Sequence, residues 1–200
     1  MTDISEADRM RQQAGVPRRT MTAHLLARAE GRPNSQTLAS LLAGWALGKG
    51  CLPADFGLGR DVFEDLLRIH FPDLAWRLPE GMPTARSDAV ARALELDDLV
   101  ALMVRHADAS VPGSRSMATV VAHGCLGSDH LWQDLGLASR RELSHLMRCN
   151  FPDLAMRNSR DMKWKKFLYR LLCEEEGLLI CRSPSCDLCG EFDHCFGPED

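Results

Sequence analysis

Three short sequence patterns occur twice in this chain of 200 residues, in the same order each time. They are Gly50–Leu52 and Gly124–Leu126, Phe56–Leu58 and Leu135–Leu137, and Phe71–Ala75 and Phe151–Ala155. The repetition indicates two similar units, at about residues 35–76 and 116–156, which can pack together as a bundle. A duplication of this kind constrains the architecture, but it says little about chemistry.

Hydrophobic periodicity predicts that the units are helical. Leu38, Leu41, Leu42 and Trp45 follow the i, i+3, i+4, i+7 spacing of one helix face. Aromatic residues make up 6% of the chain, and Leu, Ala, Met and Arg recur throughout, which favours helix over strand. We therefore expect an all-α fold. It would be a helical bundle of two similar units, followed by an irregular, cysteine-rich metal loop at the C-terminus.

Breaker residues between the helical segments suggest the domain boundaries. Residues 1–34 are expected to form a loose N-terminal arm, with a short helix at most around Met21–Ala29. A helical domain is expected over residues 35–177, with a linker at about 77–86. Residues 178–200 would then form a cysteine-rich, cluster-binding tail.

The chain has no sequence feature of a secreted or membrane-spanning protein. Residues Met1–Gln13 are polar and charged, unlike a signal peptide, and the most apolar stretch, Leu38–Leu47, is too short to cross a bilayer. We therefore expect a cytoplasmic protein without a membrane partner. In that reducing compartment, clustered cysteines indicate metal ligands or redox centres rather than structural disulfides.

Four of the eight cysteines lie in the last twenty residues with the spacing C-x4-C-x2-C-x5-C. They are Cys181, Cys186, Cys189 and Cys195. This segment has no apolar periodicity, so a bound metal centre is the simplest physical account of how it becomes ordered. Spacing alone favours an iron-sulfur cluster but leaves structural zinc open, because Cys186 and Cys189 could form one zinc knuckle and His194 could be a ligand.

The charges of the C-terminal third are segregated. Residues 174–200 contain eight acids and one base, whereas residues 140–170 contain nine bases and three acids. A positive helix beside the tail could attract an oxyanion and neutralise an anionic cluster. Lys163, Lys166 and Arg170 are the candidates for this face. The alternatives are an ordinary solvated helix face or a partner-docking surface, while a net charge of −4 disfavours nucleic-acid binding.

Several other side chains are secondary candidates. His130 and His145 could cap helices or act as metal ligands. Cys173 lies eight residues before the cluster and could be near it. Cys51 and Cys125 occupy equivalent positions in the two units, which suits small buried core residues.

Five segments of the C-terminal part, in their order along the chain, resemble a known family. They are Asp129–Leu137, Phe151-Pro152, Asp161–Tyr169 with Leu172–Glu174, and the cysteine segment closing in Cys195–Glu199. In sequence and order they resemble the nitrogen-fixation protein NifQ family. The resemblance is strongest over residues 122–200 and extends to about residue 35, while the first residues match nothing in it.

The resemblance implies a metal-cluster carrier rather than an enzyme. A member of this family would donate molybdenum for the iron-molybdenum cofactor of nitrogenase, holding a molybdenum-iron-sulfur cluster on the four matching cysteines. It would contact the nitrogenase cofactor-assembly proteins, a molybdate or other molybdenum source, and a cysteine desulfurase. The resemblance also favours an iron-sulfur cluster over zinc as the metal centre of these cysteines.

A cluster of the 3Fe-4S type needs three cysteine ligands and leaves one corner open, whereas a 4Fe-4S cluster takes four. We therefore hypothesise that three cysteines hold irons, and that the fourth, or His194 or Asp193, assists the incoming molybdenum. No nucleophile-base pair, phosphate loop or dinucleotide fingerprint in the sequence indicates an enzyme.

Overall fold

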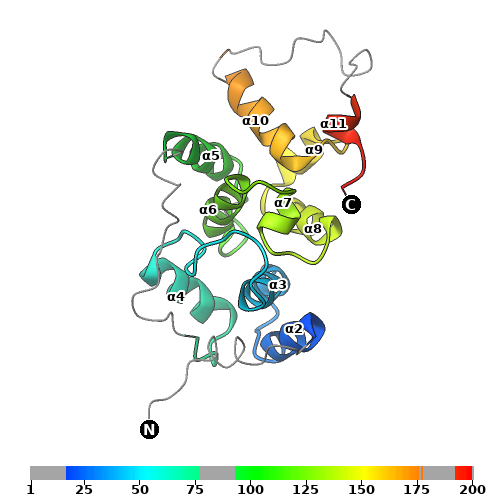
Figure 1. Cartoon of the computed structure of the whole chain (residues 1–200). Helices are drawn as coiled ribbons and strands as arrows, with labels where there is room; N and C mark the ends of the chain where they lie inside the picture. Colours follow the sequence, from blue (N-terminus) through cyan, green and yellow to red (C-terminus); the bar gives the residue numbers. More distant parts are fainter. Residues whose placement is uncertain (1–16, 77–92, 176, 178–191, 200) are drawn as a thin grey trace.

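A computed structural model describes residues 17–76, 93–175, 177 and 192–199, and these residues contain helices but no strand (Figure 1). The expected all-α class is confirmed. None of the described helices is both long and apolar enough to cross a membrane. The helices are α2 (Arg18–Leu26), α3 (Ser35–Ala46), α4 (Arg60–His70), α5 (Ala93–Arg105), α6 (Ser114–Cys125), α7 (Leu131–Asp134), α8 (Arg140–Asn150), α9 (Pro152–Arg157), α10 (Trp164–Glu175) and α11 (Phe192–Phe196).

Helix α3 is part of the hydrophobic core. All of its residues except Gln36 are buried, and Leu38, Leu41 and Leu42 have no exposed surface. A helix that is apolar on nearly all sides lowers its free energy by packing among other helices rather than on a surface. The predicted stripe is therefore confirmed.

Helix α2 packs against α3, and Figure 1 shows the two side by side. Met21 and Leu25 are 2% and 0% exposed, and Arg18 donates from Nη2 to the carbonyl oxygen of Ser40 at 2.9 Å. Within the segment expected to be a loose arm, the residues Arg18–Leu26 therefore form a helix that is packed against the core. Two apolar side chains spaced i, i+4 were enough to bury one face of a short helix.

The repeated Phe-Pro sequences adopt similar backbone conformations. Phe71 has φ −142° and ψ 71°, and Phe151 has φ −137° and ψ 60°. In each case the Phe side chain is buried, and its N–H donates to the carbonyl four residues earlier, in Leu67 or Met147. The local match ends there, because Phe151 is followed directly by helix α9. The organisation into two units stays a prediction.

The predicted linker at 77–86 and most of the cysteine-rich tail lie outside the described residues. The described end of the tail contains a short helix, α11, where an irregular loop was expected. The rings of Phe192 and Phe196, spaced i, i+4, stack with centroids 4.6 Å apart. That stacking favours a helical turn at this point.

Candidate metal centre

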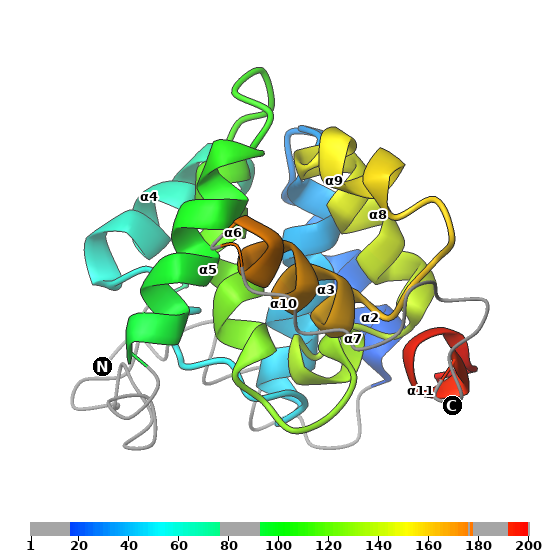
Figure 2. The same cartoon turned by 90° about the horizontal axis from the view of Figure 1, so that it is seen from above.

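The end of the cysteine-rich tail folds back onto the helical body. In Figures 1 and 2, α11 lies on the same side of the molecule as α8. The backbone N–H of Lys163 donates to the carbonyl oxygen of Cys195 at 2.8 Å, and Lys163 Nζ donates to the carbonyl oxygen of Asp193 at 3.3 Å. Lys163 therefore holds α11 through both its main chain and its side chain.

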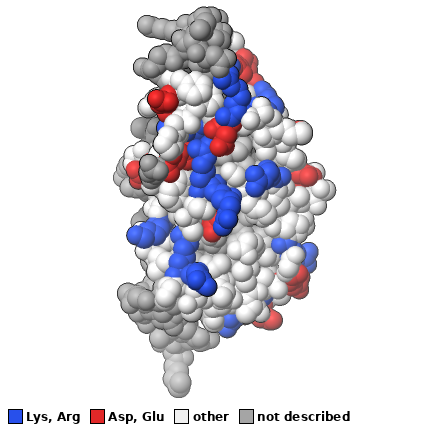
Figure 3. All heavy atoms as spheres, turned by 90° about the vertical axis from the view of Figure 1, so that its right-hand side faces the viewer, with Lys and Arg blue, Asp and Glu red and all other residues white. Residues whose placement is uncertain are grey.

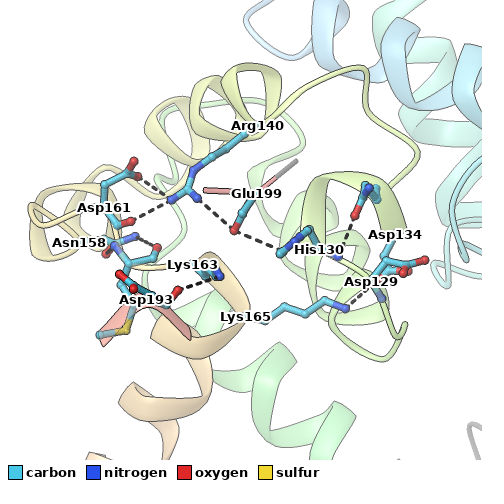
Figure 4. Close-up of polar contacts among 12 residues, drawn as sticks. Asp129, His130, Asp134, Arg140, Asn158, Asp161, Lys163, Lys165, Asp193 and Glu199 are labelled. Carbon is cyan, nitrogen blue, oxygen red and sulfur yellow. Dashed lines mark hydrogen bonds and ion pairs between the residues drawn. The ribbon is translucent and has the colours of Figure 1, made fainter. Parts of the chain in front are cut away.

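The second attachment is an ion pair beyond α11. Arg140 Nη1 lies 3.1 Å from Glu199 Oε1, and the Glu199 side chain is 3% exposed (Figure 4). Such a buried carboxylate requires a nearby cation, because desolvation of an unpaired charge costs several kcal/mol. Arg140 Nε and Glu199 Oε2 are buried without a hydrogen-bond partner among the described residues. Arg140 is thus the main charged contact of the tail end.

A tight loop before α10 orients Arg140. Arg140 Nη2 donates to both the carbonyl oxygen and the Oδ1 of Asp161, each at 2.9 Å. Asp161 has φ 56°, in the left-handed region. Asn158 stabilises this turn, since its side chain both donates to and accepts from the backbone of Met162 at 2.9 Å (Figure 4).

Arg160 provides a third contact with α11. Its guanidinium carbon lies 6.0 Å from the ring centroid of Phe192 and 5.4 Å from that of Phe196. A cation over an aromatic ring at this distance contributes about 0.5–1 kcal/mol at an exposed site. The basic segment and the described part of the acidic tail are therefore in direct contact.

Cys195 is the one predicted cluster ligand within the described residues. It lies in α11, is partly buried against the core and forms no disulfide. His194, beside it, is exposed. Cys181, Cys186 and Cys189 lie outside the described residues, so the meeting of the four cysteines stays a prediction. Among the residues that the structure describes, no three His, Cys, Asp or Glu side chains form a group that could hold a metal ion.

The secondary histidine candidates are in different surroundings. His130 precedes α7, and its Nδ1 lies 3.6 Å from Glu199 Oε1, so it borders the docked tail. His145 is exposed on α8 and lines a groove together with Arg141 and Arg148. Two guanidinium groups beside the same groove disfavour a metal cation at His145.

The candidates on α10 and just before it do not share one environment. Lys163 contacts the tail, Arg170 Nε pairs with Glu174 at 2.6 Å, and Lys166 is exposed. Cys173 is partly buried in the last turn of the helix. Lys163, Lys166 and Arg170 therefore do not act together as one face: the first contacts the tail, the second faces solvent and the third forms an ion pair within the helix.

An ion pair between α10 and α7 was missed by sequence reasoning. Lys165 Nζ contacts Asp134 and donates to the carbonyl oxygen of Gly127 at 2.9 Å, and Asp134 also accepts from the N–H of Asp129 at 3.0 Å. In the sequence, Lys165 is one of nine bases without a distinguishing mark. The segregated charges were the available signal for the Arg140–Glu199 contact, although they could not identify the pair.

The two equivalent cysteines differ in burial. Cys125 is 2% exposed and belongs to the core, as expected. Burial raises the pKa of its thiol to about 12, so the thiol stays protonated at neutral pH. Cys51 is partly exposed and lines a groove of about 680 Å³ between the end of α3 and α7, where core packing was expected.

Known proteins match most of this chain. The sequence model of the NifQ family matches residues 37–197, a range that includes all four tail cysteines. Protein NifQ of Azotobacter vinelandii is 40% identical over 176 residues, covering 84% of this chain and 90% of that protein. Protein NifQ of Rhodobacter capsulatus is 36% identical over 169 residues, covering 81% and 87%.

A third relative matches a shorter part of the chain with a higher identity. Protein NifQ of Klebsiella pneumoniae is 54% identical over 81 residues, covering 40% of this chain and 48% of that protein. No solved structure matches the chain. Because the family model spans most of the sequence and two relatives align over most of their own length, the chain belongs to the NifQ family.

Proposed function

We propose that this chain is a carrier that binds an iron-sulfur cluster and delivers molybdenum for the iron-molybdenum cofactor of nitrogenase. Membership of the NifQ family supports a role in nitrogen fixation. The observation that carries the finer proposal is the attachment of Cys195. Its carbonyl is held by the N–H of Lys163, and the chain just after it is held by the Arg140–Glu199 ion pair.

The donor set suits such a cluster. Thiolates are the soft ligands that iron-sulfur clusters take, and the four tail cysteines lie within one short segment. The backbone of Cys195 is held in place by the hydrogen bond from the N–H of Lys163 to its carbonyl oxygen. When bound, the cluster would supply sulfide ligands for a thiophilic metal. Three cysteines would hold irons, while the fourth, or His194 or Asp193, would contact the molybdenum cargo.

The charges around α11 also support the proposal. Thiolate ligation adds negative charge to a segment that is already acidic. Arg140, Arg160 and Lys163 surround the described part of that segment. Nearby cations lower the electrostatic free energy of an anionic cluster and favour the deprotonated form of its cysteine ligands.

We infer a stoichiometric carrier rather than an enzyme. Its partners would be the nitrogenase cofactor-assembly proteins, a molybdate or other molybdenum source, and a cysteine desulfurase as the source of sulfide. The alternative function is a helical interaction protein with a structural zinc site. The x2 spacing of Cys186 and Cys189, which matches a zinc knuckle, is the feature that favours it.

The test is metal and acid-labile sulfide analysis, with electron paramagnetic resonance, on protein purified without oxygen from cells supplied with molybdate. We expect iron, sulfide and molybdenum in the native protein and their loss in Cys186→Ala/Cys189→Ala. Cys51→Ala, which removes a cysteine outside the tail, serves as the control and should keep all three. Zinc without sulfide in the native protein would replace the carrier with the zinc alternative.

A further inference from the structure

Helices α3 and α8 form a groove of about 430 Å³ that is separate from the docked tail. Figure 3 shows the side of the molecule where α8 lies in Figure 1, and Lys and Arg side chains form a band along it, with acidic side chains beside parts of the band. The groove is lined by Gln36, Thr37, Ser40, Leu137, Arg141, Glu142, His145 and Arg148. Polar uncharged residues of α3 thus face basic residues of α8.

The basic side chains follow one face of α8. Arg141, His145 and Arg148 are spaced i, i+4, i+7, and all three are exposed. Among the described residues, none of the three has a hydrogen bond or ion pair from its side chain. The neighbouring Arg140 differs, because it is already paired with Glu199 and Asp161. Unpaired guanidinium groups on a groove wall are available for an external anion.

The acid in the groove does not neutralise this row. Glu142 Oε2 accepts from Ser40 Oγ at 2.6 Å and from the N–H of Ala138 at 2.9 Å. These bonds are made by one oxygen of its carboxylate, and among the described residues no ion pair joins Glu142 to Arg141 or Arg148. The wall formed by α8 is therefore electropositive.

The shape of the row indicates the kind of ligand. Arg141 and Arg148 are seven residues apart on a helix, which separates them by about 10 Å along the axis. Guanidinium groups attached at this spacing can each bind a different anionic group of one longer ligand. They match successive carboxylates of an extended or helical acidic segment, each of which a guanidinium can bind bidentately.

We propose that the α3–α8 groove docks an acidic segment of a partner protein, with carboxylates opposite Arg141 and Arg148. This goes beyond the carrier function and does not depend on the bound cluster. Because Arg140 of the same helix holds the tail, a partner in the groove would be bound beside the cysteine-bearing segment. Such docking would bring the receiving protein close to the cargo.

The test uses a fluorescein-labelled Glu-rich peptide, with its Gln analogue as the uncharged probe, and measures fluorescence anisotropy with the full chain. We expect binding of the Glu peptide only, weakening as salt is raised. Arg141→Gln/Arg148→Gln should reduce the affinity by roughly tenfold, the order expected from losing two exposed ion pairs. Both arginines are exposed, so the unfolding midpoint should not change.

The matched control is Arg68→Gln/Arg115→Gln, which removes the same charge from exposed positions outside the groove. It should bind the peptide as the native chain does. Equal losses in both double variants would mean that net charge alone attracts the peptide, and would overturn the proposal. Inorganic phosphate that binds at one site, and is lost only in the groove variant, would instead assign a small-anion site.

Discussion

The guanidinium of Arg140 contacts the carboxylate of Glu199 at 3.1 Å, joining the first residue of α8 to the end of the chain beyond Cys195. The Glu199 side chain is 3% exposed, so this pair is shielded from solvent. It connects the folded body to the segment that carries a predicted cluster ligand. A substitution in this pair should therefore weaken the docking of the tail without unfolding the helical body.

Arg140→Gln should release the tail end while leaving the helices intact. The substitution leaves the buried Glu199 carboxylate without its cation and removes the donors to Asp161. Removing one partner of a largely buried pair costs about 2–4 kcal/mol of local stability. Hydrogen exchange should become faster in residues 192–199, with an unchanged circular dichroism spectrum.

Two variants are controls for this experiment. Glu199→Gln keeps one acceptor oxygen for Arg140 and should give a smaller increase in exchange. Arg115→Gln removes an exposed arginine elsewhere and should give none. Slow exchange of residues 192–199 in Arg140→Gln would contradict the proposed role of the ion pair.

Asn34 and Asn150 should show strong energetic coupling. Both are 0% exposed, and each side-chain amide donates to the other's oxygen, at 2.7 and 2.8 Å. Asn34→Ala or Asn150→Ala should lower the free energy of unfolding by about 1–3 kcal/mol, because the remaining amide is buried without its partner. The double variant should cost less than the sum of the two single variants, as measured by urea denaturation. Additive losses would show that the amides act independently.

Gly44→Ala should destabilise the protein more than Gly48→Ala. A Cβ on Gly44 would overlap the carbonyl of Gly136, so α3 and the loop before α8 approach too closely for a side chain. Because the overlap is with backbone atoms, this overpacking should cost about 3 kcal/mol, the upper end of the usual range, and so exceed the gain of about 1 kcal/mol in helix propensity from Ala. Gly48 has φ +68° and open space around it, so its substitution costs about 1 kcal/mol of backbone strain. Thermal unfolding midpoints should rank the two variants in this order.

Cys125 should resist alkylation in the folded protein. Burial raises the pKa of its thiol to about 12, whereas an unfolded cysteine ionises near pH 8.5. The unfolded chain therefore releases this proton first, and the stability contributed by Cys125 should fall as pH rises from about 9 towards 12. Mass spectrometry after iodoacetamide treatment at pH 8 should find Cys125 modified only in denaturant. Modification at the same rate with and without denaturant would contradict its burial.

Much of the helical fold could be predicted from local sequence. The apolar stripe from Leu38 to Trp45 could be predicted without knowing what it packs against, because a helix face is visible in the sequence as apolar residues three and four positions apart. The packing of helix α2 was not predicted, because Met21 and Leu25 form only a short apolar pair, and their burial depends on the neighbouring α3. The cysteine spacing and the family resemblance likewise follow from the sequence alone.

The sequence by itself determined the helical class, the four-cysteine pattern and the segregation of charge. Only the tertiary structure decided that Arg140 pairs with Glu199, that Lys163 holds Cys195, and that Arg141 and Arg148 are left unpaired by the described residues. The reason is that an ion pair depends on distance and burial, which local propensity does not specify. Neighbours such as Arg140 and Arg141 are alike in sequence and acquire different roles because successive side chains of α8 point about 100° apart around the helix.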